Sequence, residues 1–371
     1  MRTSAEVPSP QRGRRRPLIL SAGMGAGHDT VAAELARRAA ASGHEPQVAD
    51  VLRLLPYGLG GGLRRSYQAS VRHAPWAYAG VYAAFLRAGG GPRPSGVPLA
   101  RLAADRLMDL VERVDADVVV SVFHLAAQLT GHLRARGRLR VPSTVFLVDF
   151  AVHRQWLHPG NDRYLCLTAG AAAEVRAALG TPVVTTGPAV APEFLVPAAG
   201  AAGWRQRLAG WAPGRPPVVL SAGAWGAASR PDATARLLSG AGWLPVVLCG
   251  RNARLRERVS RVPGTLALDW VEDMPGLLSA AYALVDNAAG QTAVQALAAG
   301  LPVIGYRPLP GHGLDGVRRM AALGVSELAP DAPGLLTALG RLTEDGRERS
   351  AQVARGHALF RSDPITSVAG L

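Results

Sequence analysis

The sequence contains no lysine. All 41 basic residues are arginine, against 27 acidic residues, which gives a formal net charge of +14 at pH 7. So uniform a choice of basic residue follows from genome composition as readily as from function. The charge is therefore weak support for an anionic partner, whether a nucleotide, an acidic lipid surface or a nucleic acid. No recognised nucleic-acid-binding module is present, so we expect no nucleic-acid partner.

Cysteine and long apolar runs are also scarce. The two cysteines, Cys166 and Cys249, fall in apolar, strand-like runs in different halves of the chain. This predicts buried, reduced thiols and a cytoplasmic location rather than a disulfide framework. In the most aromatic stretch the longest uncharged run is the 13 residues 74–86, whereas a membrane-spanning helix needs about 20. We therefore expect no transmembrane segment.

Residues 1–16 are polar and basic and contain proline, which predicts a disordered tail. The arginines at 14–16 precede an apolar run, as in an export signal. Glycines, His28 and Asp29 interrupt that run, so we expect no signal peptide.

From Pro17 onward, short apolar runs alternate with helical patterns along a chain of 371 residues, which is long enough for two domains. Several runs are continuously apolar, as is typical of parallel strands covered on both faces. The fold is therefore predicted to be α/β, with two doubly wound, Rossmann-like domains. The expected strands are residues 17–22, 46–51, 117–122, 143–149, 163–167, 182–186, 217–222, 244–249, 264–269, 282–286 and 302–305.

Two glycine-rich turns mark the start of each half. "LSAGMGAGH" (20–28) and "LSAGAWGAA" (220–228) each follow an apolar run and precede a helical pattern. Between the halves, residues 186–203 are rich in proline and glycine and form the best linker candidate. The predicted domains are 17–190 and 204–345, followed by a helical segment 346–371 that we expect to pack back on the first domain. Ligands of this architecture bind at the carboxyl ends of the strands, here in a central cleft between the two domains.

The first glycine turn carries a histidine. Gly25 and Gly27 allow close approach of a ligand, and a helix capped by Asp29 or its neighbour is expected to follow. His28 then lies at the mouth of that helix, where its imidazole either accepts a proton from a ligand or merely packs at the turn. A dinucleotide-binding fingerprint is a weak alternative, because the glycine spacing is wrong and Asp50 is the only candidate ribose partner.

A second turn, in the C-terminal half, is suited to a diphosphate. Gly290, Gln291 and Thr292 stand at the predicted start of a short helix and offer free backbone N–H groups and a hydroxyl. Gln295, one turn later, is placed to reach a ribose.

These motifs, in this order, resemble a known family over roughly residues 17–330. The stretches are "GMGAGHDTVAAELARR", "FLVDFAVHRQWLHPG", "SAGAWG", "CGRN", "VEDMPGLL", "GQTAVQALAAGLPVI" and "PLPGHG". They are similar to those of monogalactosyldiacylglycerol synthases and processive diacylglycerol glucosyltransferases. They also resemble, more distantly, the N-acetylglucosaminyltransferase that completes the lipid precursor of peptidoglycan.

The resemblance implies a GT-B glycosyltransferase that binds its acceptor in the N-terminal domain and a UDP-sugar in the C-terminal domain, with no cofactor or metal. It implies inverting transfer of a hexose, with His28 or, as the less favoured alternative, Asp149 as the base. The one Asp-x-Asp, Asp115 and Asp117, is interpreted as a solvated turn before a strand. The residues assigned to the donor are Gly223, Gly226, Arg251, Asn252, Val271, Met274, Gly290, Gln291, Thr292, Gln295, His312 and Gly313.

The chain departs from the family pattern at the donor site. The family usually has Gly-Gly-Leu-Thr at the diphosphate helix, where this chain has residues 289–292 (AGQT), and a glutamate where it has Gln295. The sugar-binding Pro-Gly-Gln-Glu, followed by an Asn, is here residues 310–313 (PGHG), followed by Gly316. The donor sugar is therefore left open, and a non-catalytic member that binds a UDP-sugar or a lipid remains an alternative.

An aromatic and basic insertion, residues 57–94, follows the second predicted strand. Such a helix lies in a lipid interface, contributes to the core or binds a partner helix. We expect a lipid acceptor such as diacylglycerol, and peripheral contact with an anionic membrane on the inner face of the plasma membrane. A soluble specialised metabolite is the alternative acceptor. The residues assigned to the acceptor or the membrane are Gly25, Gly27, Tyr67, Arg72, Trp76, Tyr82 and Phe85.

Overall fold

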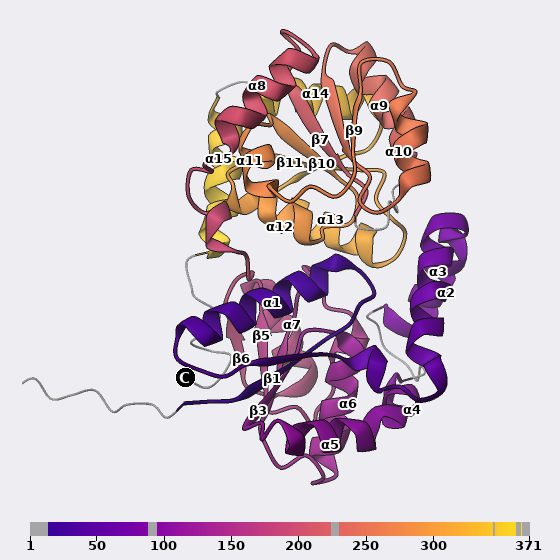
Figure 1. Cartoon of the computed structure of the whole chain (residues 1–371), viewed down its shortest axis with the longest axis vertical. Helices are drawn as coiled ribbons and strands as arrows, with labels where there is room; N and C mark the ends of the chain where they lie inside the picture. The colour runs from indigo at the N-terminus through magenta and orange to yellow at the C-terminus, as the bar shows by residue number, and fades with distance from the viewer. Residues whose placement is uncertain (1–13, 88–94, 224–229, 344–345, 361–364, 366–371) are drawn as a thin grey trace, which may run out of the picture.

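The computed structural model has two α/β domains, the N-terminal one in indigo to magenta and the C-terminal one in red to yellow (Figure 1). It describes residues 14–87, 95–223, 230–343, 346–360 and 365. Most of the predicted N-terminal tail, residues 1–13, lies outside the described residues. Each domain is built on one six-stranded parallel sheet, so the predicted pair of Rossmann-like domains is confirmed.

The N-terminal sheet has the order β2-β1-β3-β4-β5-β6. Its strands are β1 (Pro17–Ser21), β2 (Gln47–Asp50), β3 (Val118–Ser121), β4 (Ser143–Phe146), β5 (Arg163–Cys166) and β6 (Val183–Thr185). The helices that cover it are α1 (Ala26–Ala41), α5 (Ala104–Arg113), α6 (His124–Ala135) and α7 (Ala169–Leu179). Short turns of helix join them: η1 (Val51–Leu54), η2 (Pro56–Gly58), α4 (Val97–Ala100), η4 (Arg101–Ala103), η5 (Arg154–Trp156) and η6 (Pro192–Phe194).

The C-terminal sheet has the order β12-β11-β10-β7-β8-β9. Its strands are β7 (Pro217–Ser221), β8 (Leu244–Leu248), β9 (Leu266–Leu268), β10 (Ala283–Asp286), β11 (Val303–Tyr306) and β12 (Glu327–Ala329). Its helices are α8 (Ala201–Trp211), α9 (Pro231–Gly240), α10 (Ala253–Ser260), α11 (Met274–Ser279), α12 (Gln291–Ala298), α13 (His312–Ala322), α14 (Ala332–Thr343) and α15 (Arg347–His357). All eleven expected strands are present. The edge strand β12 was missed because only three residues form it and its sequence, ELA, has no apolar run.

The insertion forms a helical arm beside both domains rather than a single helix. It comprises α2 (Leu59–His73), α3 (Pro75–Val81) and the π-helical turn η3 (Tyr82–Leu86), with a break at Ala74. Figure 1 shows α2 and α3 standing at the edge of the molecule, reaching from the N-terminal domain toward α13. No helix in the described part of the chain is long and apolar enough to span a bilayer.

The predicted linker is a packed connection between the domains. Ala189 and Val190 are buried. Their carbonyls accept hydrogen bonds from both domains, that of Val190 from Arg38 of α1 at 2.6 Å and that of Ala189 from Gln291 of α12 at 3.2 Å. The linker is therefore hydrogen-bonded to α1 of the N-terminal domain and to α12 of the C-terminal domain.

The C-terminal helical segment begins on the C-terminal domain, where α15 packs against α12 and α14. The following turn, η7 (Ala358–Phe360), comes next to Gly187 at the end of the N-terminal sheet. A Cβ at Gly187 would lie 1.9 Å from the carbonyl oxygen of Leu359, so glycine permits this approach. The packing of residues beyond η7 on the N-terminal domain stays a prediction.

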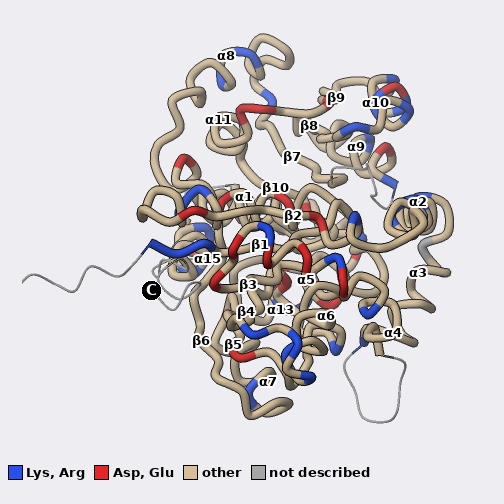
Figure 2. Tube along the Cα trace, turned by 60° about the horizontal axis from the view of Figure 1, so that its bottom comes forward, with Lys and Arg blue, Asp and Glu red and all other residues tan. Residues whose placement is uncertain are grey.

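Basic residues are spread over both domains. Figure 2 shows blue segments on α8, α9 and α10 of the C-terminal domain as well as on α6 and α7 of the N-terminal domain, with no single basic stripe. Both cysteines are buried and unpaired, as predicted. Burial raises the pKa of the Cys166 thiol to about 12, so this thiol stays protonated.

A buried ion pair lies within α1, the helix that carries His28, and its Arg38 also ties the helix to the linker by donating to Val190. Glu34 is only 5% exposed and accepts from both Arg37 and Arg38, the latter at 2.5 Å. We expect Glu34→Gln to lower the free energy of unfolding by about 2–3 kcal/mol, because it weakens a buried carboxylate's bonds to two cations. Urea unfolding measures this.

The matched control is Glu257→Gln. Glu257 and Arg261 form the same i,i+4 pair at 2.5 Å, but both side chains are exposed. We expect a change below about 0.5 kcal/mol. Equal effects of the two substitutions would contradict the stabilising role of Glu34.

Candidate active site

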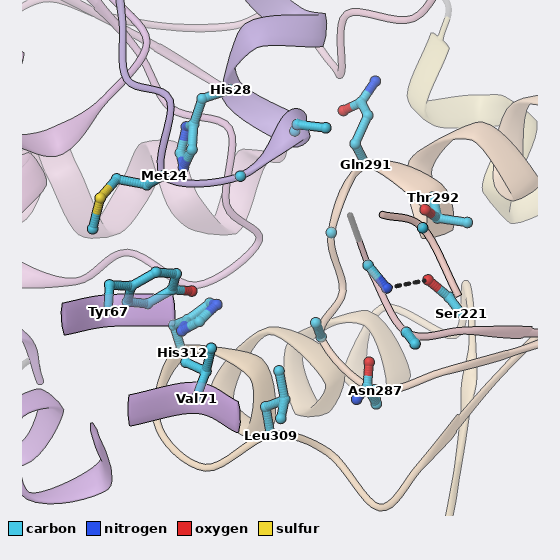
Figure 3. A pocket seen from close by; sticks show the side chains of 18 of the residues that line it. Met24, His28, Tyr67, Val71, Ser221, Asn287, Gln291, Thr292, Leu309 and His312 are labelled. Carbon is cyan, nitrogen blue, oxygen red and sulfur yellow. Dashed lines mark hydrogen bonds between the residues drawn. The ribbon is translucent and has the colours of Figure 1, made fainter. Parts of the chain in front are cut away.

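A cleft of about 780 Å³ lies between the two domains. Its walls come from the turns after β1, β3 and β4 on one side and after β7, β8 and β10 on the other, so the carboxyl ends of both sheets face it. His28 and Thr292 both line this one cleft, as the sequence predicts (Figure 3).

The turn after β1 places His28 inside the first turn of α1. The helix begins at Ala26, after Gly25, earlier than the sequence predicts. The expected cap at Asp29 is therefore wrong: Asp29 accepts instead from the Ser21 hydroxyl, at 2.6 Å. This bond ties the start of α1 to the end of β1.

The hydrogen bond of His28 defines its tautomer. Its Nδ1 lies 2.8 Å from the carbonyl oxygen of Val122, just after β3. Because a carbonyl only accepts, Nδ1 carries the proton and Nε2 of the neutral ring has a free lone pair. The ring of Phe123 stands edge-on to His28, with 5.0 Å between centroids. His28 is thus positioned as a proton acceptor facing the cleft.

Asp149, the alternative base, also lines the cleft. Its Oδ2 accepts from the indole nitrogen of Trp156 at 2.8 Å and lies 3.6 Å from Nε2 of His153. One oxygen is thus already engaged, which suits Asp149 to orientation and charge more than to proton transfer.

Two further histidines lie beside His28: His124, which the sequence did not single out, and His153, which belongs to the matched stretch FLVDFAVHRQWLHPG. The rings of His124 and His153 are 5.2 Å apart, and both side chains line the cleft. Burial, reinforced by the charges of His28 and His312, lowers the pKa of His124 to about 3. The same causes, with His124 added, lower the pKa of His153 well below its usual value. His124 follows β3 directly, so its place after a strand was a signal that could have revealed it.

The start of α12 forms the opposite wall. Its N-cap, Gly290, is extended, and among the described residues no side chain caps the helix. The preceding turn is held by Asp286, whose buried carboxylate accepts from the backbone N–H groups of Ala288 and Ala289. Burial raises the pKa of Asp286, against these hydrogen bonds. Within the described part of the chain, the first N–H groups of α12 thus have no side-chain partner and are available to an anion.

Of the residues assigned to the donor, the cleft brings together Gly223, Val271, Met274, Gly290, Gln291, Thr292, Gln295 and His312. The others have different positions. Arg251 stacks over Trp270, 4.9 Å from the ring centroid, and Asn252 caps α10 by accepting from Leu255. Gly313 is buried within α13, and Gly226 lies outside the described residues. Asn287, which directly follows β10, lines the cleft and was missed.

Of the residues assigned to the acceptor or the membrane, Gly25, Gly27 and Tyr67 line the cleft. Burial, with a contribution from the charge of Asp149, raises the pKa of Tyr67 to about 12. Trp76, Phe85 and Arg72 are exposed outside it. Tyr82 does not face a membrane: it is 4% exposed and donates to Asp315 of α13 at 2.8 Å.

The Asp-x-Asp lies away from the cleft. Asp115 is exposed at the amino end of β3, opposite the end that lines the cleft, and forms an ion pair with Arg16 at 2.7 Å. In the described residues no three His, Cys, Asp or Glu side chains are arranged to hold a metal ion.

This architecture is the GT-B fold of glycosyltransferases. The calicheamicin glycosyltransferase CalG4 superposes with a TM-score of 0.61 at 14% identity, over 97% of both chains. MurG of Acinetobacter baumannii gives 0.59 at 14% identity, over 97% of this chain and all of that chain. HepE of Anabaena, solved with UDP-glucose, gives 0.55 at 13% identity, over 96% of this chain and 97% of that chain.

Within this class, residues 28–190 match the family model of monogalactosyldiacylglycerol (MGDG) synthase. The processive diacylglycerol β-glucosyltransferases of Bacillus pumilus and Bacillus subtilis are 25% and 26% identical to this chain. Each matches 57% of this chain and 56% of its own length, so the match spans just over half of either relative. The predicted resemblance to this family is confirmed.

The buried histidines make the stability of the fold depend on pH. Because the pKa of His124 is about 3 in the folded protein and about 6.5 in the unfolded chain, its contribution is full above pH 6.5 and is lost as the pH falls toward 3. We expect His124→Asn to reduce the loss of unfolding free energy between pH 7 and pH 5 by about 1–2 kcal/mol.

Urea unfolding at both pH values measures this difference. The control is His44→Asn, because the ring of His44 accepts from a backbone N–H away from the cleft. We expect the unfolding free energy of this variant to change with pH as it does in the wild type. A His124→Asn variant that loses as much stability as the wild type on acidification would contradict the prediction.

Proposed function

We propose that the protein is an inverting glycosyltransferase that moves a hexose from a UDP-sugar to a lipid acceptor such as diacylglycerol, without a metal ion. One observation carries the proposal: a single cleft joins His28, with a free Nε2 lone pair, to the uncapped start of α12 at Gly290. The first group accepts a proton and the second binds a diphosphate, and hexosyl transfer from a nucleotide sugar requires both.

The reaction follows from these two groups. The acceptor hydroxyl gives its proton to Nε2 of His28 while its oxygen forms a bond to the anomeric carbon. The bond from that carbon to the β-phosphate oxygen breaks, and UDP leaves with the electron pair. Because base and leaving group lie on opposite walls, attack is from the face opposite the diphosphate and inverts the configuration.

The leaving diphosphate needs compensation of its charge. The N–H groups at the start of α12 and the hydroxyl of Thr292 supply it through hydrogen bonds and the helix dipole. Val271 and Met274, which also line the cleft, offer apolar surface for the uracil ring. UDP thus fits along this wall with the hexose directed toward His28.

A lipid acceptor is supported by the names of the relatives and by the helical arm. Trp76 of the arm is 77% exposed, and Tyr57, just before α2, is 98% exposed. Arg64, Arg65 and Arg72 are on α2 of the same arm. Exposed aromatic rings among arginines favour an interface with anionic lipid, and the arm also lines the cleft through Tyr67. We therefore infer peripheral membrane contact through this arm, with the acceptor entering beside it.

The direct test is release of UDP from UDP-glucose or UDP-galactose with diacylglycerol in anionic vesicles. Release that depends on diacylglycerol supports the proposal. Release of UDP only with a soluble acceptor would mean that the acceptor is a soluble specialised metabolite and not a lipid. Binding of UDP-sugar without any turnover would indicate a non-catalytic member, and no binding of UDP would overturn the proposal.

His28 is expected to act in the chemical step. We expect His28→Ala to lower kcat by about 10²- to 10⁴-fold, because the acceptor hydroxyl then has no positioned base. Calorimetric affinity for UDP should stay within about twofold, since α12 binds the diphosphate. The control is His44→Ala, beyond the other end of α1, which should leave kcat unchanged. Full activity of His28→Ala would refute the assignment.

Membrane contact through the arm has a separate test. We expect Trp76→Ala to weaken sedimentation with anionic vesicles about tenfold, because it removes an exposed ring from the lipid-facing arm. The matched control is Trp211→Ala on α8, a tryptophan 58% exposed on the C-terminal domain. Equal behaviour of the two variants would argue against docking through the arm.

A further inference from the structure

The helical arm of the N-terminal domain is joined to the C-terminal domain by two tyrosines. The hydroxyl of Tyr78 lies 2.6 Å from Nδ1 of His312, and the hydroxyl of Tyr82 donates to Asp315 at 2.8 Å. Both partners belong to the first turn of α13. Gly311, just before this helix, has φ +81°, and a Cβ there would lie 2.8 Å from the ring of Tyr82. Arm and helix are therefore in close contact.

His312 is the member of this contact that lines the cleft. Figure 3 shows it beside Tyr67 and Val71 of α2, with Gln291 and Thr292 on the other side of the cleft. Its helix begins next to the diphosphate turn, because the backbone N–H of Leu309 donates to the carbonyl of Asn287 at 2.8 Å. A hexose attached to a diphosphate at α12 therefore comes within reach of His312.

The tautomer of His312 depends on Tyr78. Burial lowers the pKa of His312, although the charge of Asp149 opposes this, so the ring is neutral near pH 7 and carries one N–H. Burial likewise raises the pKa of the Tyr78 hydroxyl, which keeps its proton. That hydroxyl has no other partner in the described residues. Donation to Nδ1 of His312 satisfies it, and the proton of His312 then stands on Nε2, on the cleft side.

We propose that Tyr78 is a positioning residue for the donor hexose: it fixes His312 as a hydrogen-bond donor toward a sugar hydroxyl. This inference rests on the proposed function. His28 and His312 then have complementary roles in the cleft. His28, bonded to a carbonyl through Nδ1, accepts at Nε2, whereas His312, bonded to a hydroxyl through Nδ1, donates at Nε2. Recognition of the hexose is thereby shared between the two domains, and it requires the arm to be in place.

The test compares the affinities for UDP-glucose and UDP-galactose with the affinity for UDP alone, measured by calorimetry on the full chain. We expect Tyr78→Phe to weaken the better UDP-hexose about five- to tenfold, the effect of one hydrogen bond, and to leave UDP within twofold. The difference in affinity between UDP-glucose and UDP-galactose should also become smaller. UDP lacks the hexose, so its binding reports the diphosphate and base subsites alone.

The matched control is Tyr82→Phe, which removes the other hydroxyl of the same contact. We expect it to leave the ratio of UDP-hexose to UDP affinity unchanged, because Asp315 is not among the residues that line the cleft. In a second background, His312→Gln, the amide supplies its own N–H donor, so adding Tyr78→Phe should have no further effect on the ratio. This pair tests the inference even if Tyr78→Phe alone folds poorly.

The outcomes separate the inference from the proposed function. If the wild type binds UDP-hexose more tightly than UDP and Tyr78→Phe keeps that difference, the positioning role is overturned and the proposed function stands. If Tyr78→Phe and Tyr82→Phe lower the ratio of UDP-hexose to UDP affinity equally, the two tyrosines only hold the arm against α13. The inference is then also overturned. If the wild type binds neither UDP nor a UDP-hexose, both fail.

Discussion

The rest of the structure depends on one constraint: two parallel sheets face each other at their carboxyl ends. In a parallel sheet every following helix starts at that edge, so the starts of α1 and α12 meet across the cleft. A Cβ at Gly27 would lie only 3.6 Å from that of Gln291. Dipole ends of like sign thus point into one space, which favours an anion between them. The buried linker, bonded to both helices through Ala189 and Val190, maintains this arrangement.

The chemistry of the cleft between the two sheets is set by the hydrogen-bond partner and the burial of each imidazole. A carboxylate partner would stabilise a protonated His28, whereas the carbonyl of Val122 fixes the tautomer without adding a negative charge. The neighbouring His124 and His153 are kept neutral by burial. The only carboxylate among them, Asp149, is engaged by the indole of Trp156. His28, by contrast, lines the cleft and is bonded through Nδ1 to a carbonyl, which leaves Nε2 to accept a proton.

The strands and the glycine turn after β1 could be predicted from the sequence, because continuous apolar runs and glycines depend on local pattern alone. His28 and Thr292 were found for the same reason, since each follows a strand closely. Most of the second glycine turn, residues 224–229, lies outside the described residues. Tyr78 and the position of Tyr82 could not be found this way. Their partners, His312 and Asp315, are 234 and 233 residues away, and periodicity says only that such aromatics share a face. Asn252 was assigned to the donor from its motif, whereas locally it caps α10. A cap and a ligand contact look alike in sequence.

The glycines that replace the family's polar residues in 310–316 have a steric explanation. A Cβ at Gly313 would lie 3.1 Å from the carbonyl oxygen of Asn287, and one at Gly316 would lie 2.9 Å from the Cβ of Ala289. The first turns of α13 therefore pack directly on the turn that precedes α12, and a Glu or Asn side chain has no room there. The start of α13 therefore lies next to the turn before α12, while His312 contacts Tyr78 of the arm. The two glycines and the contact of His312 with Tyr78 thus belong to one close packing arrangement, in which the start of α13 lies against both the turn before α12 and the helical arm.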